Sequence, residues 1–154
     1  MKNIYLIILI FLASFGFSQN LTCQDLKEGK FIIPIENKTD TLYVYDHKTD
    51  VLYKHEVEME QNMNKFILIR NNNEQIEWIN EENVGIPTYA HLIWITECSY
   101  KLIPKNNDTL LYEEGIVVEI KDVDKNCMKY KSVLSIENDI EMYNIGIICK
   151  ETEN

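Results

Sequence analysis

Short apolar runs rich in Ile, Val, Tyr and Phe recur along the chain, separated by clusters of Asn, Asp, Lys and Thr. Several of these runs alternate apolar and polar residues, a pattern typical of half-buried β-strands. The pattern predicts strands at Phe31–Glu36, Thr41–Asp46, Val51–Glu58, Lys65–Arg70, Gln75–Asn80, Tyr89–Ile95, Ser99–Pro104, Ile116–Val123, Met128–Ile136 and Glu141–Lys150.

The connections between these runs are short, and a short connection forces successive strands to be antiparallel neighbours. We therefore expect an all-β domain, an antiparallel meander that closes into a small barrel, with two packed sheets as the alternative. One short helix turn is predicted over residues 23–28. Thr22 can cap its start with Asp25 as the capping-box partner, and Gly29 can adopt the left-handed conformation that ends a helix.

One predicted hairpin carries a polar group on a single face. The turn at residues 71–74 sets Arg70 opposite Gln75, and the alternation then places Glu77 on the same face. An arginine, an amide and a carboxylate together can serve as the polar contacts of a mostly apolar ligand pocket. The alternative interpretation is a solvated cross-strand pair, which contributes less than about 1 kcal/mol.

A second hairpin is predicted at the end of the chain, around a two-residue turn at Asn138-Asp139. This register sets Met128 opposite Cys149 and Tyr130 opposite Ile147. Cys127 and Cys149 then lie one position out of register, on opposite faces. A bulge or a three-residue turn would bring them opposite each other.

The amino terminus has the pattern of a secretory signal peptide. Lys2 precedes an almost unbroken apolar run, Ile4–Phe17, and small Ser18 precedes polar Gln19. We expect a signal peptide over residues 1–18 and a single β domain over residues 19–154, exported to the periplasm or secreted. An uncleaved membrane anchor is the alternative, but the run is shorter than the roughly 20 residues that span a bilayer. No stable membrane span is expected after cleavage.

The four cysteines all lie in the predicted mature chain. An even number of cysteines in an oxidising compartment predicts two disulfides, and four cysteines allow three connectivities. The C-terminal hairpin brings Cys127 beside Cys149, and a bulge or a three-residue turn would allow them to bond, so Cys127–Cys149 with Cys23–Cys98 is the preferred pairing. The spacing does not suit zinc, because no two cysteines are two to four residues apart.

Charge and composition exclude several classes of function. The net charge is −10, and removal of residues 1–18 takes away Lys2 and no acid, giving −11. This acidity argues against nucleic-acid or anionic-membrane partners, which require clustered Lys and Arg. Arg70 is the only arginine, so a phosphate site built on an arginine cluster is excluded. The glycines stand alone and form no phosphate-binding loop. No cofactor is expected.

No catalytic or metal site can be assembled from the sequence. The histidines (His47, His55 and His91) lack a recognised metal spacing. Residues 122–126 begin like a calcium loop, but Cys127 stands where the loop needs glycine. With the cysteines in disulfides, no nucleophile–base pair can be nominated. We therefore expect a protein that is not an enzyme.

Two resemblances add to this reading. Gly29-Lys30-Phe31 resembles the Gly-x-Trp start of lipocalins, with Phe in place of Trp, and implies a lipocalin-like architecture. A wider pattern is similar to a group of small exported flavobacterial-type proteins of unknown function. It comprises Cys23, Gly29–Phe31, Arg70, Gln75–Glu77, Trp94 and Cys98–Leu102. That resemblance implies a bacterial envelope or secreted setting and a Cys23–Cys98 bridge, and it implies no activity.

The sequence thus predicts an exported, disulfide-bonded β-barrel. It would bind a small apolar or amphipathic ligand through Arg70, Gln75 and Glu77. The alternative is a structural or interaction protein of the cell envelope with a filled core and no ligand. A hydrolase ranks last, because it would need a His/Asp/Glu cluster near a cleft.

Overall fold

The computed structural model describes residues 21–36, 39–60, 62–105, 115–136 and 139–151. The predicted signal peptide, residues 1–18, lies outside these ranges. Ten strands and one 3₁₀ turn occupy the described chain, and each predicted strand is confirmed to within two residues at either end. The elements are η1 (Cys23–Leu26), β1 (Gly29–Pro34), β2 (Thr39–Asp46), β3 (Val51–Glu58), β4 (Lys65–Asn71), β5 (Glu74–Ile79), β6 (Thr88–Thr96), β7 (Ser99–Pro104), β8 (Ile116–Asp124), β9 (Cys127–Ile136) and β10 (Ile140–Lys150).

Eight of the strands form a closed antiparallel barrel, as predicted. Strands β4 to β10 pair with their neighbours in sequence order, and β1 joins the two ends by pairing with both β4 and β10. The closing contact is short, since only Phe31 and Ile32 of β1 pair with β10, opposite Lys150 and Cys149. Closure removes the free sheet edges within the barrel itself.

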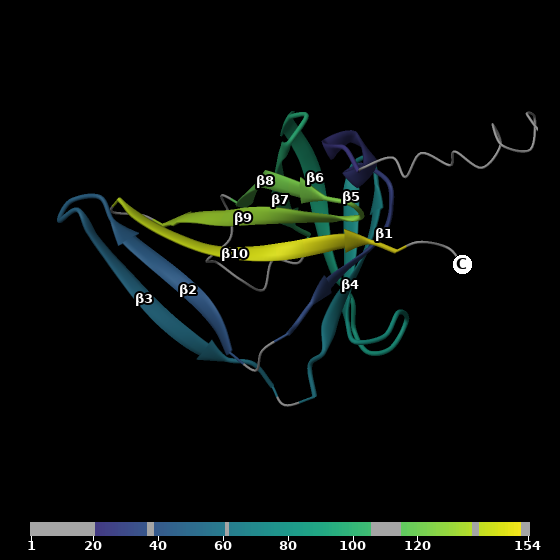
Figure 1. The fold of residues 1–154 in the computed structure, drawn as a ribbon, viewed down its shortest axis with the longest axis horizontal. Coiled ribbons are helices and arrows are strands. Elements are labelled where there is room, and N and C mark those ends of the chain that lie inside the picture. Colours follow the sequence, from purple (N-terminus) through teal and green to yellow (C-terminus); the bar gives the residue numbers. More distant parts are fainter. Residues whose placement is uncertain (1–20, 37–38, 61, 106–114, 137–138, 152–154) are drawn as a thin grey trace, which may run out of the picture.

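The remaining two strands depart from an uninterrupted meander. The β2–β3 hairpin is inserted between β1 and β4, and β2 pairs with Tyr143–Ile140 at the start of β10. The hairpin therefore extends the sheet away from the barrel as a projecting wing, seen at the left of Figure 1. Within the part of the chain that the structure describes, β3 has no strand on its outer edge.

One end of the barrel is closed by the N-terminal segment. Leu26 of η1 is fully buried and packs with Phe31, Leu68, Met128 and Ile148 in the main core cluster. The predicted capping box is present. The Asp25 carboxylate accepts hydrogen bonds from both the backbone N–H and the hydroxyl of Thr22. The turn ends at Leu26, two residues earlier than predicted. Gly29 has a φ of +125° as the first residue of β1, and it does not cap the helix.

The predicted register of the β9–β10 hairpin is wrong by one residue. Cys127 lies directly opposite Cys149, and Met128 opposite Ile148, because three residues rather than two separate the paired ends at Ile136 and Ile140. The last of the three, Asp139, has a φ of +63°, the left-handed conformation common in three-residue hairpin loops. A one-residue slip exchanges the two faces of a strand. The partners of Met128 and Tyr130 are therefore Ile148 and Gly146, not Cys149 and Ile147.

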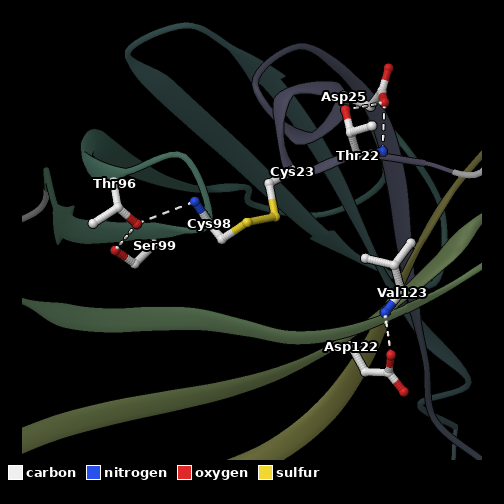
Figure 2. The surroundings of a disulfide bond; sticks show 8 residues. All are labelled: Thr22, Cys23, Asp25, Thr96, Cys98, Ser99, Asp122 and Val123. Carbon is white, nitrogen blue, oxygen red and sulfur yellow. Dashed lines mark hydrogen bonds between the residues drawn. A yellow bond between two sulfur atoms is a disulfide. The ribbon is translucent and has the colours of Figure 1, made fainter.

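The two disulfides are Cys23–Cys98 and Cys127–Cys149, the favoured pairing. The first ties the η1 turn to the β6–β7 connection, as Figure 2 shows. The second disulfide links β9 to β10, the strand on which β1 closes the barrel. No helix in the described part of the chain is long and apolar enough to cross a membrane.

Candidate ligand cavity

A polar group lies inside the barrel, formed by the three residues that the sequence singled out. In the β4–β5 hairpin Arg70 pairs with Gln75, and Leu68 with Glu77, as the two-residue turn Asn72-Asn73 requires. Arg70 is 3% exposed and Gln75 is 5% exposed. The solvated-pair alternative is therefore wrong, because this face of the hairpin points into the barrel.

Neutral acceptors and aromatic rings hold the Arg70 guanidinium. Its Nε donates to Gln75 Oε1 at 2.8 Å, one terminal nitrogen to the Tyr100 hydroxyl at 2.6 Å and the other to the Leu26 carbonyl at 3.4 Å. The same group lies over the Tyr100 ring at 4.5 Å and over the Phe31 ring at 5.3 Å. These contacts fix its orientation in the barrel interior.

The contacts of Arg70 leave part of its binding capacity unused. A guanidinium has five N–H donors, and three hydrogen bonds are formed, so two N–H groups have no partner among the described residues. The ion pairs of the described residues do not include Arg70. A buried cation without a paired carboxylate is costly, and it attracts any anionic group that can reach it.

Glu77 lies two residues from Gln75 on β5, and its carboxylate interacts favourably with the Arg70 charge. Its carboxylate accepts a hydrogen bond from the Gln75 side-chain amide at 3.4 Å. Burial raises the pKa of the Glu77 carboxyl above its usual value, and this effect exceeds the opposing effects of the Arg70 charge and the Gln75 hydrogen bond. Glu77 therefore takes up a proton more readily than an exposed glutamate.

The three residues of this polar group line a cavity of about 430 Å³. Its size falls within the range of small-molecule sites, roughly 300–1,000 Å³. Apolar and polar side chains contribute equally to its inner wall, and the polar residues come from four different strands. The inner lining comprises Phe66, Leu68, Arg70, Gln75, Glu77, Tyr100, Leu102, Ile116, Val118, Tyr130, Ser132 and Ile148.

The mouth of the cavity lies where β1 and β2 separate along β10. β1 leaves β10 after Ile32, and β2 joins it only at Tyr43, so the residues of β10 from Asn144 to Ile148 pair with neither strand. The remaining lining residues flank this gap: Ile33, Pro34, Ile35, Glu36, Thr39, Asp40, Met59, Asn144, Ile145, Gly146 and Ile147. The inserted hairpin thus creates the opening by drawing the chain away from β1.

Tyr130 crosses the interior beside the mouth, and Gly146 makes room for it. A Cβ atom at position 146 would lie 2.5 Å from the Tyr130 hydroxyl and 2.6 Å from the adjacent ring carbon. Burial raises the pKa of the Tyr130 phenol, which therefore stays protonated and remains a hydrogen-bond donor toward the cavity.

Sequence reasoning missed Tyr100 and Tyr130 as members of this site. Both lie on the inward face of strands whose alternation was recognised, Tyr100 with Leu102 and Tyr130 with Met128. The available signal was a tyrosine on an otherwise apolar strand face. Alternation alone does not show that this face surrounds a cavity.

The other candidate residues do not come together. His47 lies 3.7 Å from Glu141 beside the β2–β3 turn, His55 is exposed on β3, and His91 is exposed on β6. Residues 122–126 form the end of β8 and a tight turn, with the Asp122 side chain accepting from the Val123 N–H (Figure 2). The described residues hold no group of three or more His, Cys, Asp or Glu side chains suited to a metal ion.

Comparison with known proteins gives no relative. No family model, no curated protein and no solved structure matches the chain.

Proposed function

We propose that this protein is an exported binding protein that holds a small amphipathic molecule in its barrel. The acidic end of the ligand lies on Arg70, and its apolar part lies along the cavity wall. The observation that carries the proposal is the buried guanidinium, which lines a cavity of about 430 Å³ and has two N–H groups without a partner among the described residues.

The two ends of the cavity support the same orientation of the ligand. The inner end carries the positive charge of Arg70. The mouth is flanked by the apolar Ile33, Ile35 and Met59 and by the acidic Glu36 and Asp40. An aliphatic chain with a terminal carboxylate matches this arrangement, with its carboxylate at Arg70 and its chain directed toward the mouth. The raised pKa of Glu77 weakens the repulsion that an ordinary glutamate would exert on an acidic ligand.

The setting is part of the proposal. The two disulfides are consistent with an oxidising compartment, and residues 1–18 have the pattern of a secretory signal. The cavity argues against the alternative of a completely filled core. In this proposal the barrel binds its ligand and does not transform it.

The test is a binding measurement with a matched pair of probes. Dodecanoate and dodecanol would displace a fluorescent amphiphile from the mature, disulfide-bonded protein. We expect dodecanoate to bind about 10- to 100-fold more tightly, because a hydrogen bond to a charged group contributes about 1.5–3 kcal/mol. Arg70→Met should abolish this preference and leave dodecanol binding largely unchanged. Lys121→Met, an equal loss of charge on the exposed surface, should preserve it.

A second variant protects the test against misfolding of Arg70→Met. Val118 lines the cavity and is 4% exposed, so Val118→Phe should reduce the binding of both probes by filling the space. Equal affinities for the acid and the alcohol would overturn the role of Arg70. Failure of both probes to bind the folded wild-type protein would overturn the binding function.

A further inference from the structure

The β2–β3 wing carries a second surface, which is independent of the cavity. All eight residues of β3 are exposed, and its outer edge is unpaired among the described residues. The strand pairs with β2 from Val51 to Glu58 without a register shift. A long, regular edge of this kind offers a row of free backbone N–H and C=O groups for another strand, and it contains no proline or bulge that would prevent pairing.

The side chains of β3 are unusually apolar for an exposed edge. Tyr53 is 49% exposed, Val57 44% and Leu52 52%. Tyr53 and Val57 share one face of the sheet, since side chains alternate along a strand. This face continues through Val44 of β2 to Met142 of β10. An apolar strip on a projecting edge indicates a contact surface.

The wing is held firmly enough to present this edge. Tyr43 of β2 stacks on Tyr143 of β10 with ring centroids 4.8 Å apart, and Lys131 lies 4.0 Å from the Tyr143 ring centroid. Asn144 also donates to Asp40 at 3.4 Å. The hairpin therefore projects as an extension of the sheet (Figure 1).

We propose that β3 pairs antiparallel with β3 of a second copy of this chain, with His55 opposite His55 on the two-fold axis. Such an axis stands perpendicular to the sheet, so the paired residues must come from the same face. In this register Lys54 lies opposite Glu56 of the second copy, twice by symmetry, and Tyr53 lies opposite Val57 in the same way. Opposite charges and aromatic–aliphatic pairs directly across a strand pair are both favourable.

The charged side chains of β3 favour this register over the two registers in which the axis is moved by one residue. Moving the axis by one residue sets Lys54 against Lys54 or Glu56 against Glu56, and like charges directly opposite are unfavourable. Among the described residues of a single chain, Lys54 forms one ion pair, with Glu56 of its own strand at 3.5 Å, and both side chains are more than half exposed. Both are therefore free to exchange this weak contact for one across the axis.

The net charge of the mature chain, −10 for the full sequence less the one positive charge of Lys2 and so −11, opposes the approach of two copies. The experiment therefore uses about 0.15 M salt, at which charges more than about 8 Å apart are screened. Sedimentation equilibrium of the mature, disulfide-bonded protein should show a dimer that dissociates on dilution. A monomer at every concentration would overturn the proposal and leave β3 available to a strand from a different protein.

A charge exchange tests the register itself. Lys54→Glu and Glu56→Lys should each raise the dissociation constant by about tenfold or more, because each turns two attractive pairs into repulsive ones. The double variant, Lys54→Glu with Glu56→Lys, should restore dimerisation. The matched control is the same exchange at Lys121 and Glu119, which form an equivalent pair on β8 and should not affect the dimer.

These variants change only exposed side chains, so circular dichroism should confirm that all of them fold. A dimer that is insensitive to both single exchanges, or that the double exchange does not restore, would place the contact elsewhere and overturn the pairing.

Discussion

Replacing Gly146 by alanine tests how closely Tyr130 approaches β10. Gly146 is not among the described glycines with positive φ, so its backbone tolerates any residue. The one obstacle is Tyr130. The added Cβ would lie 2.5 Å from its hydroxyl, 2.6 Å from the attached ring carbon and 2.9 Å from a second ring carbon.

Two effects of opposite sign decide the outcome. Alanine at a compatible strand position stabilises a protein by about 0.4–1 kcal/mol, because the unfolded chain loses freedom. Overpacking a well-packed site costs about 1–3 kcal/mol. Since contacts below 3.0 Å require the ring to move, we expect Gly146→Ala to lower the free energy of unfolding by about 1–2 kcal/mol.

A double-mutant cycle in urea isolates the contact. With an m-value of about 1–3 kcal/mol/M, the single variant should unfold at a midpoint lower by about 0.5–1 M. In a Tyr130→Leu background, which removes the clashing atoms, Gly146→Ala should be neutral or slightly stabilising. An equal loss of stability in both backgrounds would refute the reasoning, since the strain would then lie in the backbone of β10.

Two further predictions concern the charge and the covalent links of the barrel. Burial raises the pKa of Glu77 in the folded state, so its contribution to stability is present below the unfolded pKa of about 4.3 and is lost as pH rises through the folded pKa. Urea unfolding should therefore show that Glu77→Gln gains stability relative to the wild-type protein between pH 4 and pH 7, and a difference independent of pH would contradict this. In the chain-entropy model, loss of the Cys23–Cys98 bridge costs about 4.5 kcal/mol and loss of Cys127–Cys149 about 3.4 kcal/mol, because their sequence separations are 75 and 22 residues. Replacing each pair by alanine and comparing the unfolding free energies checks this order, which is wrong if the shorter link proves to be the more stabilising.

The strands themselves were predictable because their signals are local. Alternation within a run and Asn-rich turns are read from a few neighbouring residues, and the two-residue turn at Asn72-Asn73 was sufficient to place Arg70, Gln75 and Glu77 on one face. The register of the last hairpin was not predictable in the same way. Loops of two and of three residues both fit the sequence around Asp139, and the choice between them, which shifts the register by one residue, depends on the backbone conformation of the loop.

The sequence by itself determined the class of fold, the pairing preference of the cysteines and the three polar residues that share a strand face. Only the tertiary structure decided that this face lies inside a barrel and that Tyr100 and Tyr130 join it. The deciding contacts are non-local: β1 closes the barrel on β10, at Ile32 and Cys149, and Leu26 closes its end. Whether a strand face is buried is decided only when such distant segments meet. The burial of Arg70, the cavity and its mouth therefore result from the closure of the barrel and not from any local sequence pattern.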